Sequence, residues 1–254
     1  YFLYHLDEPR VVLGLVVHLD YEDPSLSPFG ELQRFKQHPA LQALLRGGRR
    51  IGYGARVIAE GGWQSVPRLV FPGGVLVGDT AGFVNIARIK GTHNALWSGV
   101  LAADYISRAF LTGDDSLAEL DTDWRASEIG GDLYPARNIK PLWSRFGLFG
   151  LALGGLDLWT QQVLKWSAFG TMAHRSSDHA ALRPNAAGPP RVYPRPDGQF
   201  TFDRLSSVFL ANTAHRDDQP LHLKVADPDL QERSELGIYG GPSQHYCPAG
   251  VYEW

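Results

Sequence analysis

The stretch that decides the fold covers residues 61–103 and reads GGWQSVPRLVFPGGVLVGDTAGFVNIARIKGTHNALWSGVLAA. It predicts a short apolar strand at Val75–Val77, then the dipeptide Gly78-Asp79, then a loop to Lys90. A helix rich in small residues follows, from about Gly91 to Phe110. Because glycine carries no side chain, this strand, turn and helix start predict a place where backbone approaches a bound ligand closely.

The same arrangement is typical of flavoproteins of the glutathione-reductase-like class. Gly78 would let the backbone approach the cofactor, and Asp79 would accept a hydrogen bond from a ribityl or ribose hydroxyl. The free N–H groups of Gly91, Thr92, His93 and Asn94 would direct positive charge at the pyrimidine edge of the flavin, which favours its reduction. The alternative is that Gly-Asp forms an ordinary turn and the helix is only packed.

The flanking sequence predicts further elements from apolar periodicity and from turn residues. A hairpin is expected near the start of the chain, and a proline-rich linker precedes a final region of short strands and turns. The predicted elements are strands at Tyr1–Leu6, Arg10–Leu19 and Ile51–Ala59, helices at Gly30–Leu45 (with a break near Pro39), Leu117–Ile129 and Phe146–Phe169, and a linker at Arg183–Gly198.

The composition is that of a globular protein with one large domain or two smaller ones. Hydrophobic residues make up 44% of the 254 residues and charged residues 20%. The net charge is −3 and no basic runs alternate with aromatic residues, so no nucleic-acid partner is expected. Cys247 is the single cysteine, which excludes a disulfide within the chain and indicates a reducing compartment. One cysteine does not hold a zinc ion or an iron–sulfur cluster by itself.

A membrane-surface segment is predicted from Phe146 to Trp166. Between Arg145 and Lys165 this stretch carries one charge, Asp157. Basic ends and tryptophans such as Trp166 suit a headgroup interface, and the run is too short and too interrupted to span a bilayer. An internal amphipathic helix is the alternative.

Short motifs along nearly the whole chain resemble the electron transfer flavoprotein–ubiquinone oxidoreductase family. No single motif is decisive, but their common order is hard to obtain by chance. They are FLYHL from Phe2, LGLVV from Leu13, LSPF from Leu26, GYGAR from Gly52, QSVP from Gln64, PGG from Pro72, IKGTH from Ile89, YPRPDG from Tyr193, LSSV from Leu205, DQPLHL from Asp218 and CPAGVYE from Cys247.

The resemblance implies an enzyme that uses FAD, one [4Fe–4S] cluster and ubiquinone, with reduced electron transfer flavoprotein as its electron donor. Cys247, followed by Pro248, matches the first cluster ligand of the family. The flavin-side residues implied are Gly78, Asp79 and the helix start from Gly91 to Asn94. The family docks on one membrane face, which implies the cytoplasmic face of a bacterial inner membrane, or the mitochondrial inner membrane in a eukaryote.

The expected fold class is α/β, with helices and strands mixed. It would combine part of a glutathione-reductase-like FAD domain with a β-rich quinone-binding region and a partial ferredoxin-like domain. The expected divisions are residues 1–60 for the quinone-binding region, 61–130 for the closing half of the FAD domain, 131–182 for a helical membrane-facing stretch and 183–254 for the iron–sulfur part.

Two signatures of such a flavoprotein do not occur in these 254 residues. There is no GxGxxG turn for the pyrophosphate, and no CxxCxxC run follows Cys247. We therefore expect a fragment of the enzyme that is inactive alone. The alternatives are a FixC-like or geranylgeranyl-reductase-like flavoprotein, or a truncated remnant without catalytic function.

Overall fold

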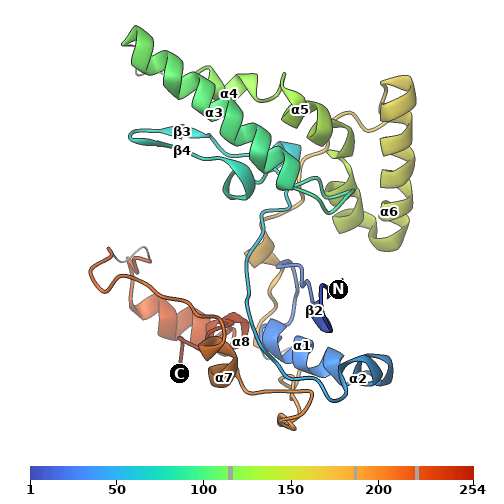
Figure 1. The fold of residues 1–254 in the computed structure, drawn as a ribbon, viewed down its shortest axis with the longest axis vertical. Helices are drawn as coiled ribbons and strands as arrows, with labels where there is room; N and C mark the ends of the chain where they lie inside the picture. Colours follow the sequence, from blue (N-terminus) through green and yellow to red (C-terminus); the bar gives the residue numbers. More distant parts are fainter. Residues whose placement is uncertain (114–116, 186–187, 221–222) are drawn as a thin grey trace. The chain divides into compact units, whose positions relative to one another are not determined.

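The computed structural model describes residues 1–113, 117–185, 188–220 and 223–254 (Figure 1). The chain folds as two units, one made of residues 1–55 with 176–254 and the other of residues 56–175. Helices and short strands are mixed, as the sequence predicts. In the described residues the named strands form two separate antiparallel pairs, and no parallel sheet occurs there.

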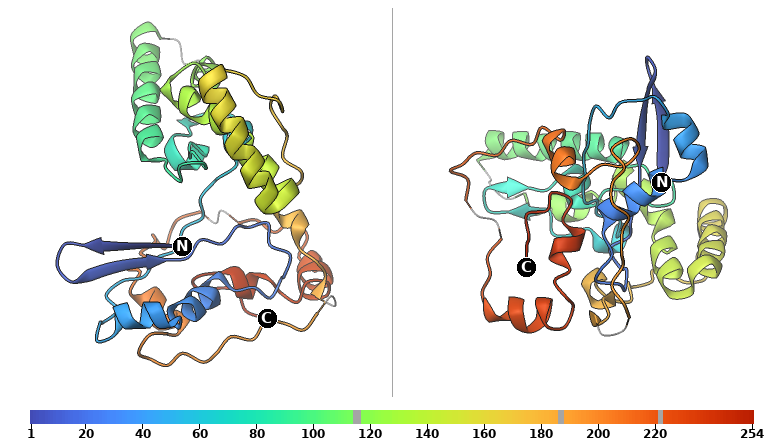
Figure 2. Two further views of the ribbon diagram at one scale, coloured as in Figure 1. Left: turned by 90° about the vertical axis from the view of Figure 1, so that its right-hand side faces the viewer. Right: turned by 90° about the horizontal axis from the view of Figure 1, so that it is seen from below.

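The predicted hairpin at the start of the chain is confirmed. Strands β1 (Phe2–Leu6) and β2 (Arg10–Gly14) pair antiparallel, with Phe2 opposite Gly14. Figure 2 shows them as a narrow ribbon that extends away from the neighbouring helices of the first unit. The second strand ends at Gly14, not at Leu19 as predicted. Since Phe2 is the first residue of β1, residues beyond Gly14 have no ladder partner there to hold them extended.

The predicted helix with a break near Pro39 is confirmed as two helices, α1 (Pro28–Lys36) and α2 (Pro39–Leu45). Ser27 caps α1, because its Oγ accepts a hydrogen bond from the Gly30 N–H at 3.1 Å. Pro39 begins α2, where a missing N–H costs nothing.

The prediction of a strand at Ile51–Ala59 is wrong. Residues 51–59 are irregular, and Ile51 and Val57 are exposed. Gly52 and Gly54 weaken this segment as a strand.

The described residues between 198 and 254 contain helical turns in place of the predicted short strands. Asp203 caps the first of them by accepting a hydrogen bond from the Ser206 N–H at 2.8 Å. The proline-rich stretch is irregular where it is described, while residues 186–187, and residues 221–222 of the DQPLHL motif, lie outside the described part. These helical turns are α7 (Arg204–Phe209), a π-helical turn (Gln231–Leu236) and α8 (Ser243–Tyr246), and a 3₁₀ turn (Asp178–Ala181) precedes the proline-rich stretch.

The second unit surrounds a compact apolar core. The predicted strand at Val75–Val77 is shorter, because β4 pairs only with the two residues of β3 across the turn at Pro72-Gly73. Leu69, Phe83, Trp124, Ile129 and Leu133 are each at most 2% exposed in this core. The elements are β3 (Val70–Phe71), β4 (Gly74–Val75), α3 (Thr92–Thr112), α4 (Leu120–Asp123), α5 (Glu128–Leu133), α6 (Ile139–Leu164) and the 3₁₀ turns Trp63–Ser65, Gly78–Ala81 and Tyr134–Ala136.

The helix predicted at Leu117–Ile129 is wrong as one element, because it splits into α4 and α5. Ser127 adopts an extended backbone and caps α5, with its Oγ accepting from the Ile129 N–H at 3.3 Å. The helix predicted at Gly91–Phe110 is confirmed as α3.

Helix α6 reverses direction at Gly147, which has φ 58° and ψ −134°. A Cβ added to Gly150 or Gly154 would meet Leu142 or Ile139 of the first arm. In a straight helix the pair 142 and 150 would be about 12 Å apart, so the two arms fold back on each other. The predicted helix at Phe146–Phe169 therefore corresponds mainly to the second arm, which ends at Leu164.

Asp157 of the second arm points into the protein and is 3% exposed. Its carboxylate accepts hydrogen bonds from Asn138 Nδ2 at 2.9 Å and from Ser167 Oγ at 2.5 Å. One turn along, Gln161 Oε1 accepts from the buried Arg137 guanidinium at 3.3 Å. The single charge of the predicted membrane segment is therefore turned inward, which leaves the opposite face of the arm uncharged.

We expect Asp157→Ala to destabilise the protein by about 3 kcal/mol, because the buried Asn138 amide and Ser167 hydroxyl lose their acceptor. The free energy of unfolding from urea titration measures the change. Asp104→Ala removes an exposed carboxylate of α3 and is expected to change the free energy of unfolding by less than about 0.5 kcal/mol. Equal losses of stability in the two variants would contradict the role of Asp157 as a buried hydrogen-bond acceptor.

Candidate functional site

The 3₁₀ turn Gly78–Ala81 lies directly against the first turns of α3. The Gly78 N–H donates to Ser98 Oγ at 2.8 Å. Gly78 has φ 62°, and a Cβ there would lie 3.2 Å from the Ala95 Cβ. Both the left-handed backbone and the close approach to α3 therefore favour glycine at this position.

The start of α3 has no side-chain cap. Its N-cap residue is Gly91, and the first bond inside the helix runs from the Ala95 N–H to the Gly91 carbonyl at 2.8 Å. The N–H groups of Thr92, His93 and Asn94 have no acceptor within the helix, and the dipole of a 21-residue helix adds positive potential at this end. An anionic or electron-rich ligand edge would be stabilised here.

The carboxylate of Asp132, in α5, gathers the side chains around this helix start. It accepts from Arg88 Nη1 at 2.9 Å and from Asn94 Nδ2 at 3.0 Å, and it lies 3.0 Å from His93 Nε2. The Asp132 backbone carbonyl also accepts from Asn85 Nδ2 at 3.0 Å. One residue of α5 therefore fixes both the loop before α3 and the first turn of α3.

The environment of Asp132 holds its carboxyl group in the ionised form. Burial by itself would raise the pKa, but the hydrogen bonds from Asn94 and His93 and the charge of Arg88 outweigh it and lower the pKa from its usual value of 3.8. The side chain is 11% exposed, so this is a charge partly withdrawn from water and held by its neighbours.

Asn94 carries a buried acceptor that has no donor. The residue is 0% exposed, its Nδ2 is used by Asp132, and its Oδ1 has no hydrogen-bond partner. Since buried polar atoms are nearly always paired, this oxygen fits a site that a ligand donor completes. Together with the glycine contact and the uncapped helix, it is the observation that fits a bound flavin.

The structure therefore brings the six predicted flavin-side residues into one region formed by the 3₁₀ turn and the start of α3. Asp79 and Thr92 are exposed there, which leaves them accessible to a ligand. Sequence reasoning missed Asp132, Arg88 and Ser98, because nothing in their spacing links them to the Gly-Asp turn.

Cys247, in the other unit, is buried at the end of α8. Its neighbour Pro248 receives a hydrogen bond on its carbonyl from the Tyr53 hydroxyl at 3.2 Å. Arg204 Nη1 donates to the Gln244 carbonyl at 2.9 Å. Burial, and then the charge of Arg204, lower the pKa of His245. Among the described residues no three His, Cys, Asp or Glu side chains gather to hold a metal ion.

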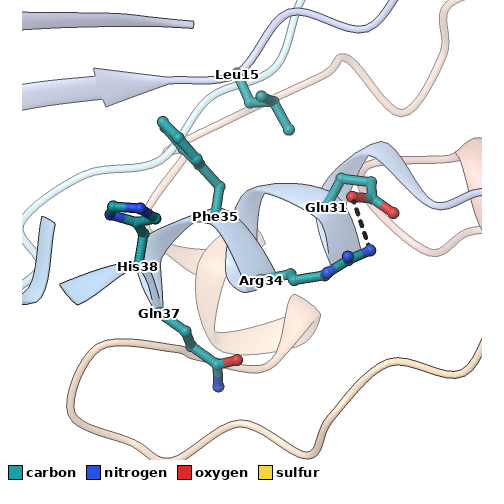
Figure 3. A pocket seen from close by; sticks show the side chains of 6 residues that line it. All are labelled: Leu15, Glu31, Arg34, Phe35, Gln37 and His38. Carbon is teal, nitrogen blue, oxygen red and sulfur yellow. Dashed lines mark ion pairs between the residues drawn. The ribbon is translucent and has the colours of Figure 1, made fainter. Parts of the chain in front are cut away.

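A cleft of about 420 Å³ lies between α1 and the segment after β2 (Figure 3). Phe35 and Leu15 form its apolar part, while His38 lies at one end. Glu31 and Arg34 form an ion pair at 3.7 Å within it. Covering this pair with an apolar ring would remove two charges from water, so the cleft is poorly suited to a quinone ring.

Comparison with known proteins places both ends of the chain in one family. A family model described as "ETF-QO, ubiquinone-binding" matches residues 1–58. A second, described as "Electron transfer flavoprotein-ubiquinone oxidoreductase, 4Fe-4S", matches residues 198–254. The two matched models are described as the quinone-binding part and the iron–sulfur part of one redox enzyme family.

Curated relatives agree over the whole chain, and all three described here are electron transfer flavoprotein–ubiquinone oxidoreductases. The mitochondrial protein of Homo sapiens is 46% identical over 100% of this chain and 42% of its own length. The Pseudomonas aeruginosa protein is 44% identical over 99% of the chain and 46% of its own length. The mitochondrial protein of Oryza sativa is 43% identical over 100% of the chain and 43% of its own length.

The chain belongs to the electron transfer flavoprotein–ubiquinone oxidoreductase family. It spans less than half the length of these relatives. In the described part of the chain, no helix combines the length and the apolar character that a membrane crossing needs.

We expect Asp132→Asn to lower stability at neutral pH by about 1–2 kcal/mol, because Arg88 and His93 lose a charged partner. The folded-state pKa of Asp132 is lowered, so its stabilisation is present above 3.8 and is lost as pH falls through the folded-state pKa. Urea unfolding at neutral pH and in strong acid should therefore show a gap between wild type and variant that narrows in acid. A gap independent of pH would contradict this.

Proposed function

We propose that the protein containing this chain transfers electrons from reduced electron transfer flavoprotein, through FAD and a [4Fe–4S] cluster, to ubiquinone. The observation that carries the proposal is the match of both ends of the chain to the quinone and cluster models of one family. Ubiquinol formation takes two electrons and two protons. Since the donor delivers single electrons, two deliveries are required for each ubiquinol.

The flavin side of this function rests on Gly78, Asp79 and the helix start from Gly91 to Asn94. When bound, FAD accepts electrons and passes them on to ubiquinone. The N–H groups of Thr92 and His93, with the helix dipole behind them, would stabilise negative charge on the ligand. Asn94 Oδ1 would accept a hydrogen bond from a donor group of the ligand, and the exposed carboxylate of Asp79 would accept one from a ligand hydroxyl. Asp132 keeps His93 and Asn94 in position.

We propose Cys247 as one thiolate ligand of the cluster. A [4Fe–4S] cluster takes four cysteine ligands, and this chain has one. The described residues therefore do not provide all the ligands of a [4Fe–4S] cluster. Support for the ligand role comes from the buried position of Cys247 and from the cluster model that covers residues 198–254.

The four-part division of the chain also stands as a proposal. Residues 1–60 would serve the quinone side, 61–130 would close a glutathione-reductase-like FAD domain, and 183–254 would contribute to a ferredoxin-like cluster domain. The quinone-binding and cluster matches, at residues 1–58 and 198–254, support the first and last parts.

Residues 131–182 would dock the protein on a membrane surface, through the second arm of α6. A set of its exposed apolar side chains lies at intervals of eight, three and four residues, which places them on one helical face. They are Leu148, Leu156, Trp159, Val163 and, just after the helix, Trp166. Inward-turned Asp157 leaves this face without charge, so an apolar surface and interfacial tryptophans are available to a lipid headgroup layer. The cytoplasmic face of a bacterial inner membrane, or the mitochondrial inner membrane, is the location proposed.

The electron-transfer proposal is tested on the complete gene product with reduced electron transfer flavoprotein and a soluble quinone. We expect quinone-dependent reoxidation of the donor. Cys247→Ser should remove the electron paramagnetic resonance signal of the reduced cluster, since one ligand thiolate is lost. Ser206→Ala, at a half-buried hydroxyl that donates to Asp203, should leave that signal intact. A cluster signal that survives in Cys247→Ser would rule out the ligand role.

Membrane docking is tested with Trp159→Asp, which places a charge in the middle of the apolar face. Partition into phosphatidylcholine vesicles is expected to fall by at least about tenfold, because an apolar contact is lost and a charge must be desolvated. Val192→Asp, at a valine that is 89% exposed in the other unit, is the matched control and should change little. Equal partition of both variants would exclude this face as the docking surface.

A further inference from the structure

A second cavity, of about 280 Å³, lies beside the second arm of α6. Its walls come from four places: the loop before α3, the end of α5, the 3₁₀ turn Tyr134–Ala136 and the flank of α6. Its polar lining consists of the amides of Asn85 and Gln162, the cations Arg88 and Lys165, and the carboxylate of Asp132. It is lined by residues of the second unit alone.

The charges in this cavity leave one cation without an acidic partner. Arg88 Nη1 is paired with Asp132 Oδ1 at 2.9 Å, which neutralises the carboxylate. Lys165 is exposed and has no ion pair among the described residues. With the carboxylate compensated and the Asn85 amide donating to the Asp132 carbonyl, Lys165 and Gln162 present net positive charge and hydrogen-bond donors to an anion of modest size.

The cavity borders the apolar face of α6. Leu158, Gln162 and Lys165 lie at intervals of four and three residues, so they follow one flank of the helix. The exposed apolar residues Trp159, Val163 and Trp166 each come next in sequence and occupy the adjoining face. A ligand with a charged head and apolar chains would reach both surfaces at once.

We propose that this cavity binds the phosphate of an anionic phospholipid headgroup, while the acyl chains contact the apolar face of α6. The inference rests on the membrane docking proposed above and adds a specific lipid class to it. A free phosphate would use the donors of the cavity alone. A phospholipid would also use the neighbouring Trp159 and Val163, whose exposure the free anion does not explain.

The full chain is tested for partition into two kinds of vesicle, pure phosphatidylcholine and equal parts of phosphatidylcholine and phosphatidylglycerol. Wild type should prefer the anionic vesicles. Lys165→Gln should weaken partition into the anionic vesicles about fivefold and leave partition into neutral vesicles unchanged. Lys90→Gln removes an exposed lysine of the same loop that does not line the cavity, and it should keep most of the preference.

Equal losses in Lys165→Gln and Lys90→Gln would overturn the site, because they would indicate a diffuse surface charge. Vesicle binding without any preference for anionic lipid would also overturn the site, while leaving membrane docking intact.

If wild type binds neither kind of vesicle, the membrane-docking proposal fails. The cavity is then tested with soluble glycerol phosphate and with inorganic phosphate, read from tryptophan fluorescence because Trp166 adjoins Lys165. A saturable fluorescence response to glycerol phosphate that Lys165→Gln abolishes would support the site. No response to glycerol phosphate, or an equal response to inorganic phosphate, would overturn the proposed site.

Discussion

The carboxylate of Asp132 is the constraint on which the site in the second unit depends. It lies at the meeting point of the loop before α3, the first turn of α3 and α5, and it binds Arg88 and Asn94 directly. With the side chains of His93 and Asn94 occupied in this way, the uncapped backbone N–H groups of the helix start remain available. The same carboxylate borders the cavity beside α6, so one half-buried anion orients donors toward two neighbouring surfaces.

Helix α6 depends on the buried carboxylate of Asp157. Asp157 and its partner Asn138 hold the second arm against the first after the reversal at Gly147, and Gly150 allows the two arms to touch. Polar groups are thereby concentrated on the inner side of the arm. The outer side of the arm is therefore apolar. The second arm presents an uncharged face even though Asp157 lies in the middle of its sequence.

The sequence correctly predicted those elements whose formation depends on residues close together in the chain. The hairpin turn at Glu8, the break at Pro39 and the extent of α3 follow from turn residues, proline geometry and apolar periodicity. The strand expected at Ile51–Ala59 failed because β-branched residues form a strand only where another strand pairs with them. Asp132 and the inward turn of Asp157 depend on contacts with residues distant in sequence, and no spacing rule contains that information.

Membership of the family accounts for the two models that match the ends of the chain, and the geometry of the second unit supports the proposed flavin site. The central claim is that the start of α3, with Gly78 and Asn94, faces the flavin. The most direct measurement is the position of FAD in an experimental structure of the complete gene product. The account predicts the pyrimidine edge of the flavin within hydrogen-bond distance of the N–H groups of Thr92 and His93. A flavin bound elsewhere, with this helix start covered by protein, would contradict it.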